Sequence, residues 1–326
     1  MTAPALDASY FVERGFDVEN VRELTGGVSN VVLEVRHAAG VFVVKRALER
    51  LRVATEWLAD PRRILRERDA LLLLDRVLPG AAPRVLWSDD HHLLFAMTAV
   101  DGPTWKQEMM AGRISQAFAT QVAAILGETI RRTWLSPELR DTFAARHFFE
   151  ELRLDPYYRT VAARHPDLAS RIHALIEDSC AQPRAFTHGD FSPKNIIVTA
   201  SGEPVLLDFE VAHYGDPSFD LAFCLNHLSL KWFHLRNHRP SLEASLRAFW
   251  QTLSHTMPEE LDALERLTLR HLSALMLARV DGKSPVEYLA PPEQVTVRAF
   301  SRALILDPPL SWDDYLNRLL TNDQDL

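Results

Sequence analysis

The sequence has few cysteines and no long apolar run, and both absences restrict the class of protein. Only Cys180 and Cys224 occur among 326 residues, too few for a disulfide framework and not at a metal-ligand spacing. No apolar stretch approaches the ~20 residues of a membrane-spanning helix, and the N-terminus lacks a basic segment followed by apolar residues. We therefore expect a cytoplasmic protein with reduced cysteines and no membrane partner.

Positive charge is also scarce. The chain carries 36 Lys and Arg against 44 Asp and Glu, a formal net charge of -8. This balance argues against nucleic acid as a partner and favours a cationic small molecule. The sequence shows no internal repeat or low-complexity tract, and its length suits one large or two coupled domains. We expect a monomer or a homodimer.

The first hundred residues predict an antiparallel sheet with one helix. β-branched runs at 31–37 and 41–47 alternate with glycine-containing turns, and residues 82–103 predict two further strands around a polar turn. Between them, residues 61–78 predict a helix that Asp60 caps and Pro79 ends. We expect five strands and this helix to form one unit.

From about residue 104 the apolar residues recur three and four apart, which is typical of helices. The exception is the segment around "NIIVTASGEPVLLDFE", which predicts a hairpin with its turn at Ser201-Gly202. A turn centred there places Asn195 opposite Asp208, with Cβ atoms roughly 4.5–5.5 Å apart. An amide oxygen and a carboxylate so placed are suitable ligands for Mg²⁺. The remaining helices are expected at 115–134, 167–180, 241–253 and 261–280.

The loop "THGDFSPKNIIV" leads into this hairpin and contains Asp190. An isolated Asp in a loop rich in Gly, Ser and Pro most often ties a turn through backbone amides. The neighbouring pair of Asn195 and Asp208 favours a second interpretation, in which Asp190 acts on a proton beside a metal.

These motifs together carry a family resemblance. His188-Gly189-Asp190, Asn195, Asp208-Phe209 and the segment "GDPSFDLAF" at 215–223 resemble the aminoglycoside phosphotransferase and choline kinase family. The resemblance implies a protein-kinase-like, two-lobed α+β fold. Its lobes would comprise residues 1–97 and 103–326, joined by a hinge at 98–102.

The resemblance also implies the chemistry. The expected reaction moves the γ-phosphate of ATP, or of GTP, to a hydroxyl of a small molecule, with an aminoglycoside-like antibiotic or an amino alcohol favoured. Asp190 would be the catalytic residue, while Asp208 and Asn195 would hold Mg²⁺. Asp220 would brace the catalytic loop through its backbone amides, and His188 would have a structural role.

Lys45 and Glu67 are the expected phosphate-binding pair. Glu67 falls within the apolar stripe of the helix at 61–78, where an unpaired carboxylate is expensive. Lys45, at the end of "VFVVK", is the natural partner and would reach the phosphates. Glu56 is a rival partner for Lys45. Alternatively, Glu67 pairs at the surface with Arg63 or Arg68.

Two further segments would contact the nucleotide. In "TGGVSN", Gly26 and Gly27 would let backbone amides approach the phosphates, with Ser29 assisting. Met97 and Ala99 would offer backbone groups to the purine. Alternatively, these segments are an ordinary turn and an ordinary final strand.

Two other functions stay open. One is a catalytically silent kinase fold that binds nucleotide only. The other is a zinc site formed by His227, His234 and His238, which share one side of a possible helix. Glu210 and Lys194 depart from the protein-kinase pattern, and Lys194 contacts either phosphate or solvent.

Overall fold

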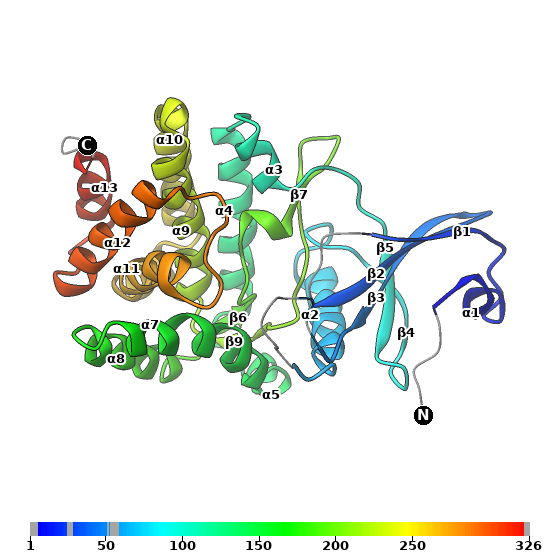
Figure 1. The fold of residues 1–326 in the computed structure, drawn as a ribbon. Helices are drawn as coiled ribbons and strands as arrows, with labels where there is room; N and C mark the ends of the chain where they lie inside the picture. The colour runs from blue at the N-terminus through cyan, green and yellow to red at the C-terminus, as the bar shows by residue number, and fades with distance from the viewer. Residues whose placement is uncertain (1–5, 25–28, 51, 53–58, 323–326) are drawn as a thin grey trace.

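A computed structural model gives the fold and describes residues 6–24, 29–50, 52 and 59–322. The fold is α+β, with a five-stranded antiparallel sheet followed by a larger helical part. Figure 1 shows the sheet at one end of the molecule and the helices α9 to α13 at the other, with β7 between them. Both expectations from the sequence, the sheet and the helical remainder, are confirmed.

Strand β3 is the middle strand of the sheet, whose order is β1-β2-β3-β5-β4. Its side chains alternate between two apolar clusters. Phe42 and Val44 pack with α1 on one face, while Val43 and Ala47 belong to the main core on the other. Burial of both faces explains the unbroken apolar run of this strand. The elements of the sheet are β1 (Val18–Glu23), β2 (Asn30–His37), β3 (Gly40–Ala47), β4 (Val85–Asp89) and β5 (Leu94–Thr98), with α1 (Ala8–Val12) against one face.

Helix α2 (Arg63–Val77) begins two residues later than the sequence predicted. Asp60 accepts a hydrogen bond from the backbone N–H of Arg62 at 2.8 Å, so it stabilises the turn before the helix. Pro61 lies in that turn and not at the first helical position. The predicted apolar stripe of the helix does face the core, and it includes fully buried Ile64 and Leu74.

The helical part contains the four long helices expected from the sequence, as α4, α8, α10 and α11. Helix α10 packs along α4, and α11 packs along α9. A π-helical segment, η1, carries Pro156 in its interior. The helices are α3 (Trp105–Met110), α4 (Gln116–Thr133), α5 (Pro137–Thr142), α6 (His147–Phe149), η1 (Glu150–Arg159), α7 (Thr160–Arg164), α8 (Ala169–Cys180), η2 (Pro193–Asn195), α9 (Ser218–His234), η3 (Arg236–His238), α10 (Arg239–Thr256), α11 (Pro258–Asp281), α12 (Pro291–Leu306) and α13 (Trp312–Thr321).

Two short pairs of strands interrupt the helices and carry the loop around Asp190. They are β6 (Ala185–Thr187) with β9 (His213–Gly215), and the hairpin of β7 (Ile196–Val198) with β8 (Pro204–Leu206). Across residues 6–24, 29–50, 52 and 59–322, no helix is long and apolar enough to cross a membrane.

The chain leaves the sheet at Thr98 and passes close to the hairpin at Gly102. The backbone of Gly102 has a φ of 140°, and a Cβ atom there would lie 2.2 Å from the carbonyl oxygen of Val198. Only glycine fits both the conformation and the contact. The carbonyl of Pro103 then accepts a hydrogen bond from the N–H of Val198 at 2.9 Å, which fixes the connection against β7.

Gly102→Ala should therefore destabilise the protein much more than alanine at a glycine that has space. Gly202→Ala is the matched control, because Gly202 has a φ of 78° and a Cβ atom there would meet nothing within 4 Å. We expect the control to lower the free energy of unfolding by about 1 kcal/mol, and Gly102→Ala to lower it by at least about 2 kcal/mol more. Urea unfolding measures both values, and equal losses would contradict the close contact.

Candidate active site

The loop that contains Asp190 is held by two buried side chains. Asp220, in the first turn of α9, accepts hydrogen bonds from the backbone N–H groups of His188 at 2.6 Å and Gly189 at 2.8 Å. The expected brace is therefore present. His188 accepts from the N–H of Asp190 through Nδ1 at 3.1 Å, so its Nε2 donates to the carbonyl of Leu207 at 3.1 Å. Burial lowers the pKa of His188 to about 4, which keeps the ring neutral and structural.

Asp190 is itself almost fully buried, and three donors converge on one of its oxygens. Oδ2 lies 2.9 Å from Arg153 Nη2, 2.9 Å from Lys194 Nζ and 2.8 Å from Asn195 Nδ2. None of these donors is a backbone amide, so Asp190 does not tie down its own turn. Oδ1 is buried and has no hydrogen-bond partner among the described residues. Burial acts to raise the pKa of Asp190, but Arg153 and Lys194 outweigh it and lower the pKa.

Asn195 and Asp208 lie at the base of the hairpin, but the predicted register is wrong by one residue. Ile196 pairs with Leu206, and the N–H of Leu207 donates to the carbonyl of Asn195 at 2.8 Å. Asn195 therefore faces Leu207, and Asp208 is the next residue along. The backbone of Asp208 has a φ of 69°, a left-handed conformation that Asp tolerates better than most residues. In a regular strand, the one-residue shift in register would direct the Asp208 side chain to the face of the hairpin opposite to the predicted one.

The oxygens that remain free in this pair suit Mg²⁺. The amide nitrogen of Asn195 donates to the carboxylate of Asp190. The amide oxygen of Asn195, Oδ1, forms no hydrogen bond among the described residues. The Asp208 carboxylate is 23% exposed and uses Oδ1 for Lys45, so Oδ2 is available. Mg²⁺ prefers one or two protein oxygens and takes its other ligands from water and phosphate. This donor set fits the metal.

Lys45 connects the sheet, α2 and the hairpin. Its ammonium lies 2.7 Å from Glu67 Oε1 and 3.0 Å from Asp208 Oδ1, and the lysine is only 6% exposed. Burial alone would lower its pKa, but the carboxylates of Asp208 and Glu67 raise it, so the lysine is charged. The predicted pair of Lys45 and Glu67 is present, and Lys45 is not an edge residue. Arg68 binds Asp69 and Asp90 instead of Glu67.

Comparison with known proteins places this geometry in a family. A sequence model described as the phosphotransferase enzyme family matches residues 20–264, well over half of the chain. The chain belongs to this phosphotransferase family. It is accordingly a small-molecule kinase, and the resemblance seen in the motifs is confirmed.

Three related proteins show how far the similarity extends. Methylthioribose kinase of Yersinia enterocolitica is 26% identical over 271 residues, which cover 72% of this chain and 68% of that kinase. The N-acetylmuramate/N-acetylglucosamine kinase of Pseudomonas aeruginosa is 28% identical over 191 residues, covering 54% of this chain and 52% of that kinase. The amicoumacin kinase hAmiN, solved with AMP-PNP and Ca²⁺, has a TM-score of 0.60 at 15% identity, covering 94% of this chain and 95% of that one. The last likeness shows a shared fold.

Arg63 connects the sheet to the segment that follows Asp208. Its fully buried guanidinium donates to the carbonyl of Ser29 at 2.5 Å and to that of Leu48 at 2.7 Å, and it pairs with Glu210 Oε2 at 3.0 Å. The arginine therefore joins the start of β2 to the segment after Asp208. Glu210 is paired across the two parts of the fold.

Other expected nucleotide contacts are described only in part. Gly26, Gly27 and Glu56 lie outside the described residues. Met97 pairs with Val43 within the sheet, whereas Ala99 lies just beyond β5 and is exposed. Among the described residues, the backbone of Ala99 forms no backbone hydrogen bond, so its N–H and carbonyl are available to a ligand.

The structure does not support the alternative of a zinc site. His227 and His234 lie on α9, but His238 lies in η3, and His234 binds Glu293 at 3.1 Å. Within the part of the chain that the structure describes, no group of three or more His, Cys, Asp or Glu side chains could hold a metal.

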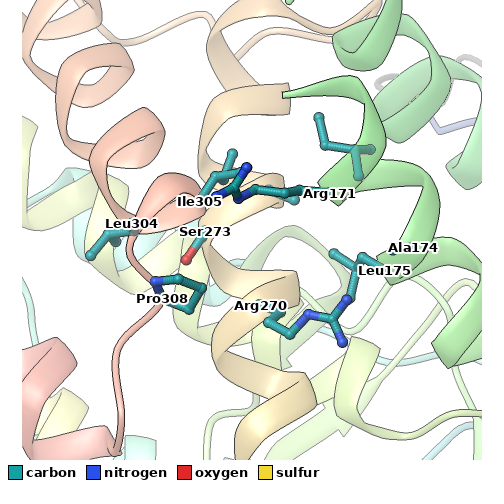
Figure 2. Close-up of a pocket in the computed structure, with 10 residues that line it drawn as sticks. Arg171, Ala174, Leu175, Arg270, Ser273, Leu304, Ile305 and Pro308 are labelled. Atoms are coloured by element: carbon teal, nitrogen blue, oxygen red, sulfur yellow. The ribbon is translucent and has the colours of Figure 1, made fainter. Parts of the chain in front are cut away.

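A separate apolar cavity of about 150 Å³ lies between α8, α11 and α12. Figure 2 shows Leu175, Leu304 and Ile305 lining it, with Arg171 and Arg270 at its edge. Arg270 also pairs with Asp178. None of the residues around Asp190 lines this cavity, so it is not part of the catalytic centre.

The sequence patterns did not predict the roles of two arginines. Arg153 pairs with Asp190, and Arg63 pairs with Glu210. Arg153 lies in the π-helical segment η1, which lacks the periodicity of an α-helix. Arg63 is adjacent to exposed Arg62, and nothing local distinguishes the two. The buried carboxylates of Asp190 and Glu210 were the available signal, since each requires a cationic partner.

Arg63→Met should destabilise the protein strongly, because it removes the buried donor of Glu210 and of four backbone carbonyls. We expect a loss of about 3–5 kcal/mol in the free energy of unfolding. The control is Arg62→Met, since the Arg62 side chain is 72% exposed and pairs only at the surface; it should change stability by less than about 1 kcal/mol. Denaturant unfolding compares the two, and a similar loss in both variants would refute the buried anchor.

Proposed function

We propose that this enzyme transfers the γ-phosphate of ATP, or of GTP, to a hydroxyl group of a small molecule in the presence of Mg²⁺. One observation carries the proposal. The buried carboxylate of Asp190 keeps Oδ1 unpartnered among the described residues, while an oxygen donor set suited to Mg²⁺ lies beside it and Lys45 contacts that set at 3.0 Å. These are the positions that phosphoryl transfer requires for acceptor, metal and phosphate.

In this mechanism Asp190 orients the acceptor hydroxyl and receives its proton. Arg153 and Lys194 lower the pKa of Asp190, so the carboxylate is ionised at neutral pH and can accept. Because the ion pairs with Arg153 and Lys194 and the hydrogen bond from Asn195 all involve Oδ2, Oδ1 is the atom that would meet the hydroxyl. Arg153 also donates to the carbonyl of Gly189 at 2.8 Å and so positions the loop.

The nucleotide would bind between the sheet and the hairpin. Lys45, charged and fixed by Glu67, would contact its phosphates, and Ala99 would offer backbone groups to the base. Asp208 and Asn195 would hold the metal, which would neutralise the charge of the phosphates during transfer. Asp220 acts only by positioning the loop.

Two kinds of observation bear on the acceptor. The acidic composition favoured a cationic small molecule, and the family resemblance favoured an aminoglycoside-like antibiotic or an amino alcohol. Two relatives are named for methylthioribose and for N-acetylmuramate or N-acetylglucosamine. A nucleotide-consumption screen should therefore include sugars and amino sugars together with aminoglycosides and choline-like alcohols. Absence of turnover across this panel, with nucleotide binding retained, would favour the catalytically silent alternative.

Asp190→Asn should lower kcat by about 10²–10⁴-fold, because the amide cannot accept the proton of the acceptor hydroxyl. Nucleotide affinity should change by no more than about threefold, since the nucleotide contacts lie on other residues. Coupled ADP release and calorimetry with AMP-PNP measure the two quantities. The control is Asp167→Asn, a surface carboxylate that pairs with Arg302, and it should retain activity. Undiminished turnover in Asp190→Asn would refute the role.

Asp208→Asn should remove most of the metal dependence of nucleotide binding. In the unmodified protein we expect Mg²⁺ to raise the affinity for AMP-PNP by about tenfold or more, and in the variant by less than about twofold. Calorimetric titrations with and without Mg²⁺ give this ratio. Glu203→Gln, an exposed carboxylate at the turn of the same hairpin, is the control and should behave like the unmodified protein. An unchanged ratio in Asp208→Asn would place the metal elsewhere.

A further inference from the structure

Helix α9 buries a lysine that lacks a counter-ion. Lys231 is fully buried, and its ammonium donates to the carbonyl of His227, one turn earlier, at 3.3 Å. No carboxylate among the described residues forms an ion pair with it. A buried charge without an opposite charge is costly to maintain. Burial, together with repulsion from Lys106, lowers the pKa of Lys231 to about 7.

A second cation without a carboxylate, Arg279 on α11, belongs to the same group of residues. Its Nη1 donates to the hydroxyl of Tyr157 at 3.1 Å and to the carbonyl of Ser284, while its buried Nε has no partner among the described residues. Within that part of the chain it forms no ion pair. A guanidinium normally binds a carboxylate or phosphate when it is half-buried.

Neutral polar atoms near these cations also lack partners. His227 Nε2 and the Tyr288 hydroxyl are buried and form no hydrogen bond among the described residues. The ammonium of Lys231 lies 5.2 Å from the centre of the Tyr288 ring. Arg279, Lys231 and Lys194 all act to lower the pKa of His227, after the larger effect of burial. Unsatisfied buried polar groups are rare in proteins, so several at one place indicate a missing ligand.

This group of residues extends to the catalytic carboxylate. Lys194, whose charge reaches His227, binds Asp190 at 2.9 Å. Tyr157 forms a second connection, because Arg279 binds its hydroxyl and the guanidinium of Arg153 lies 6.0 Å from its ring. Groups that hold the rest of an acceptor beside its reacting hydroxyl would occupy such positions.

The balance of charge around this site is positive. The cations are Lys106, Arg153, Lys194, Lys231 and Arg279, and the carboxylates that act on them are Asp190, Asp208, Glu210 and Glu287. Asp208 pairs with Lys45, and Glu210 pairs with Arg63. Asp190 already pairs with Arg153 and Lys194, and Glu287 pairs with Lys106 near the surface. Of the flanking groups, Glu293 is occupied by His234 and Asp281 by His165 and Arg298. Among the described residues, Lys231 and Arg279 are therefore left without an ion-pair partner, and the charge of Glu287 that reaches them is already paired with Lys106.

We propose that the acceptor of this enzyme carries an anionic group besides its hydroxyl, and that Lys231 and Arg279 bind this group. His227 and the Tyr288 hydroxyl complete the site with hydrogen bonds. The acceptor class is thus a hydroxylated acid, such as a sugar acid or a sugar phosphate, in place of a polycationic aminoglycoside. The inference rests on the proposed phosphotransfer function and adds the chemical class of its substrate.

The first test compares acceptors that share one sugar ring and differ in charge. Glucose, glucuronate, glucose 6-phosphate and glucosamine are offered with Mg²⁺ and ATP, and ADP release is measured. We expect kcat/KM for glucuronate or glucose 6-phosphate to exceed that for glucose by about tenfold or more, with glucosamine below glucose. The two anions distinguish a carboxylate acceptor from a phosphate acceptor. Equal or faster turnover of glucosamine than of both anions overturns the inference.

Variants then show whether the named cations cause the preference. Lys231→Met keeps the length and apolar packing of the side chain, and it should reduce the ratio of kcat/KM between anionic and neutral acceptors about tenfold, through KM. Arg279→Gln should act in the same direction. The control is Arg270→Gln, on the same helix but paired with Asp178 at the edge of the apolar cavity, and it should leave the ratio unchanged. An unchanged ratio in Lys231→Met overturns the inference.

Measurements without turnover separate this inference from the proposed function. In the absence of acceptor, Lys231→Met should raise Tm by about 2 °C, because it removes a buried charge that has no ion-pair partner among the described residues. A fall in Tm would show that the lysine is structural and would count against the site.

In the presence of ADP, glucuronate or glucose 6-phosphate should raise Tm more than glucose does, and Lys231→Met should abolish the difference. If this binding is seen but no acceptor is phosphorylated, the phosphotransfer proposal fails while the anion site stands. If charged and neutral sugars have equal effects on Tm, the anion site fails.

Discussion

Burial of charge between the sheet and the helical part is the constraint on which the rest of this structure depends. Lys45, Glu67 and Asp190 are all buried, so each requires an opposite charge or a donor from another element. Lys45 comes from β3, Glu67 from α2, and the partners of Asp190 come from η1 and η2. The charges are compensated only when these elements meet. The packing that forms the core therefore also assembles the candidate catalytic centre.

Much of this arrangement could be predicted because its signals are local in the sequence. Glu67 falls at helical spacing among apolar residues, so the sequence alone shows a carboxylate on a buried face that must find a cation. The family motifs add order along the chain, which predicts that Asp220 will reach the loop of His188 and Gly189. The structure contains both interactions, at 2.7 Å and at 2.6 and 2.8 Å respectively.

What could not be predicted depends on long-range packing or on small backbone shifts. The hairpin register differs by one residue from the expected one, and the left-handed backbone of Asp208 has no sequence signature beyond the residue type. Arg153 lies in a π-helical segment that lacks the periodicity of an α-helix. Arg63 is buried and Arg62 exposed, yet only the position of Glu210 in space distinguishes them.

The expectation of a cationic acceptor shows the same difference between global and local evidence. A net charge of -8 is an average over a whole surface, and it governs solubility and long-range attraction more than the contents of one site. A bound acceptor responds to the nearest charges, because interactions in a poorly hydrated site are screened less than those at the surface. In the group of residues that extends from Asp190 through Lys194 and Tyr157, these charges are mostly positive. Two of them, Lys231 and Arg279, form no ion pair among the described residues. The local field therefore outweighs the composition, and it favours a substrate that brings the missing negative charge.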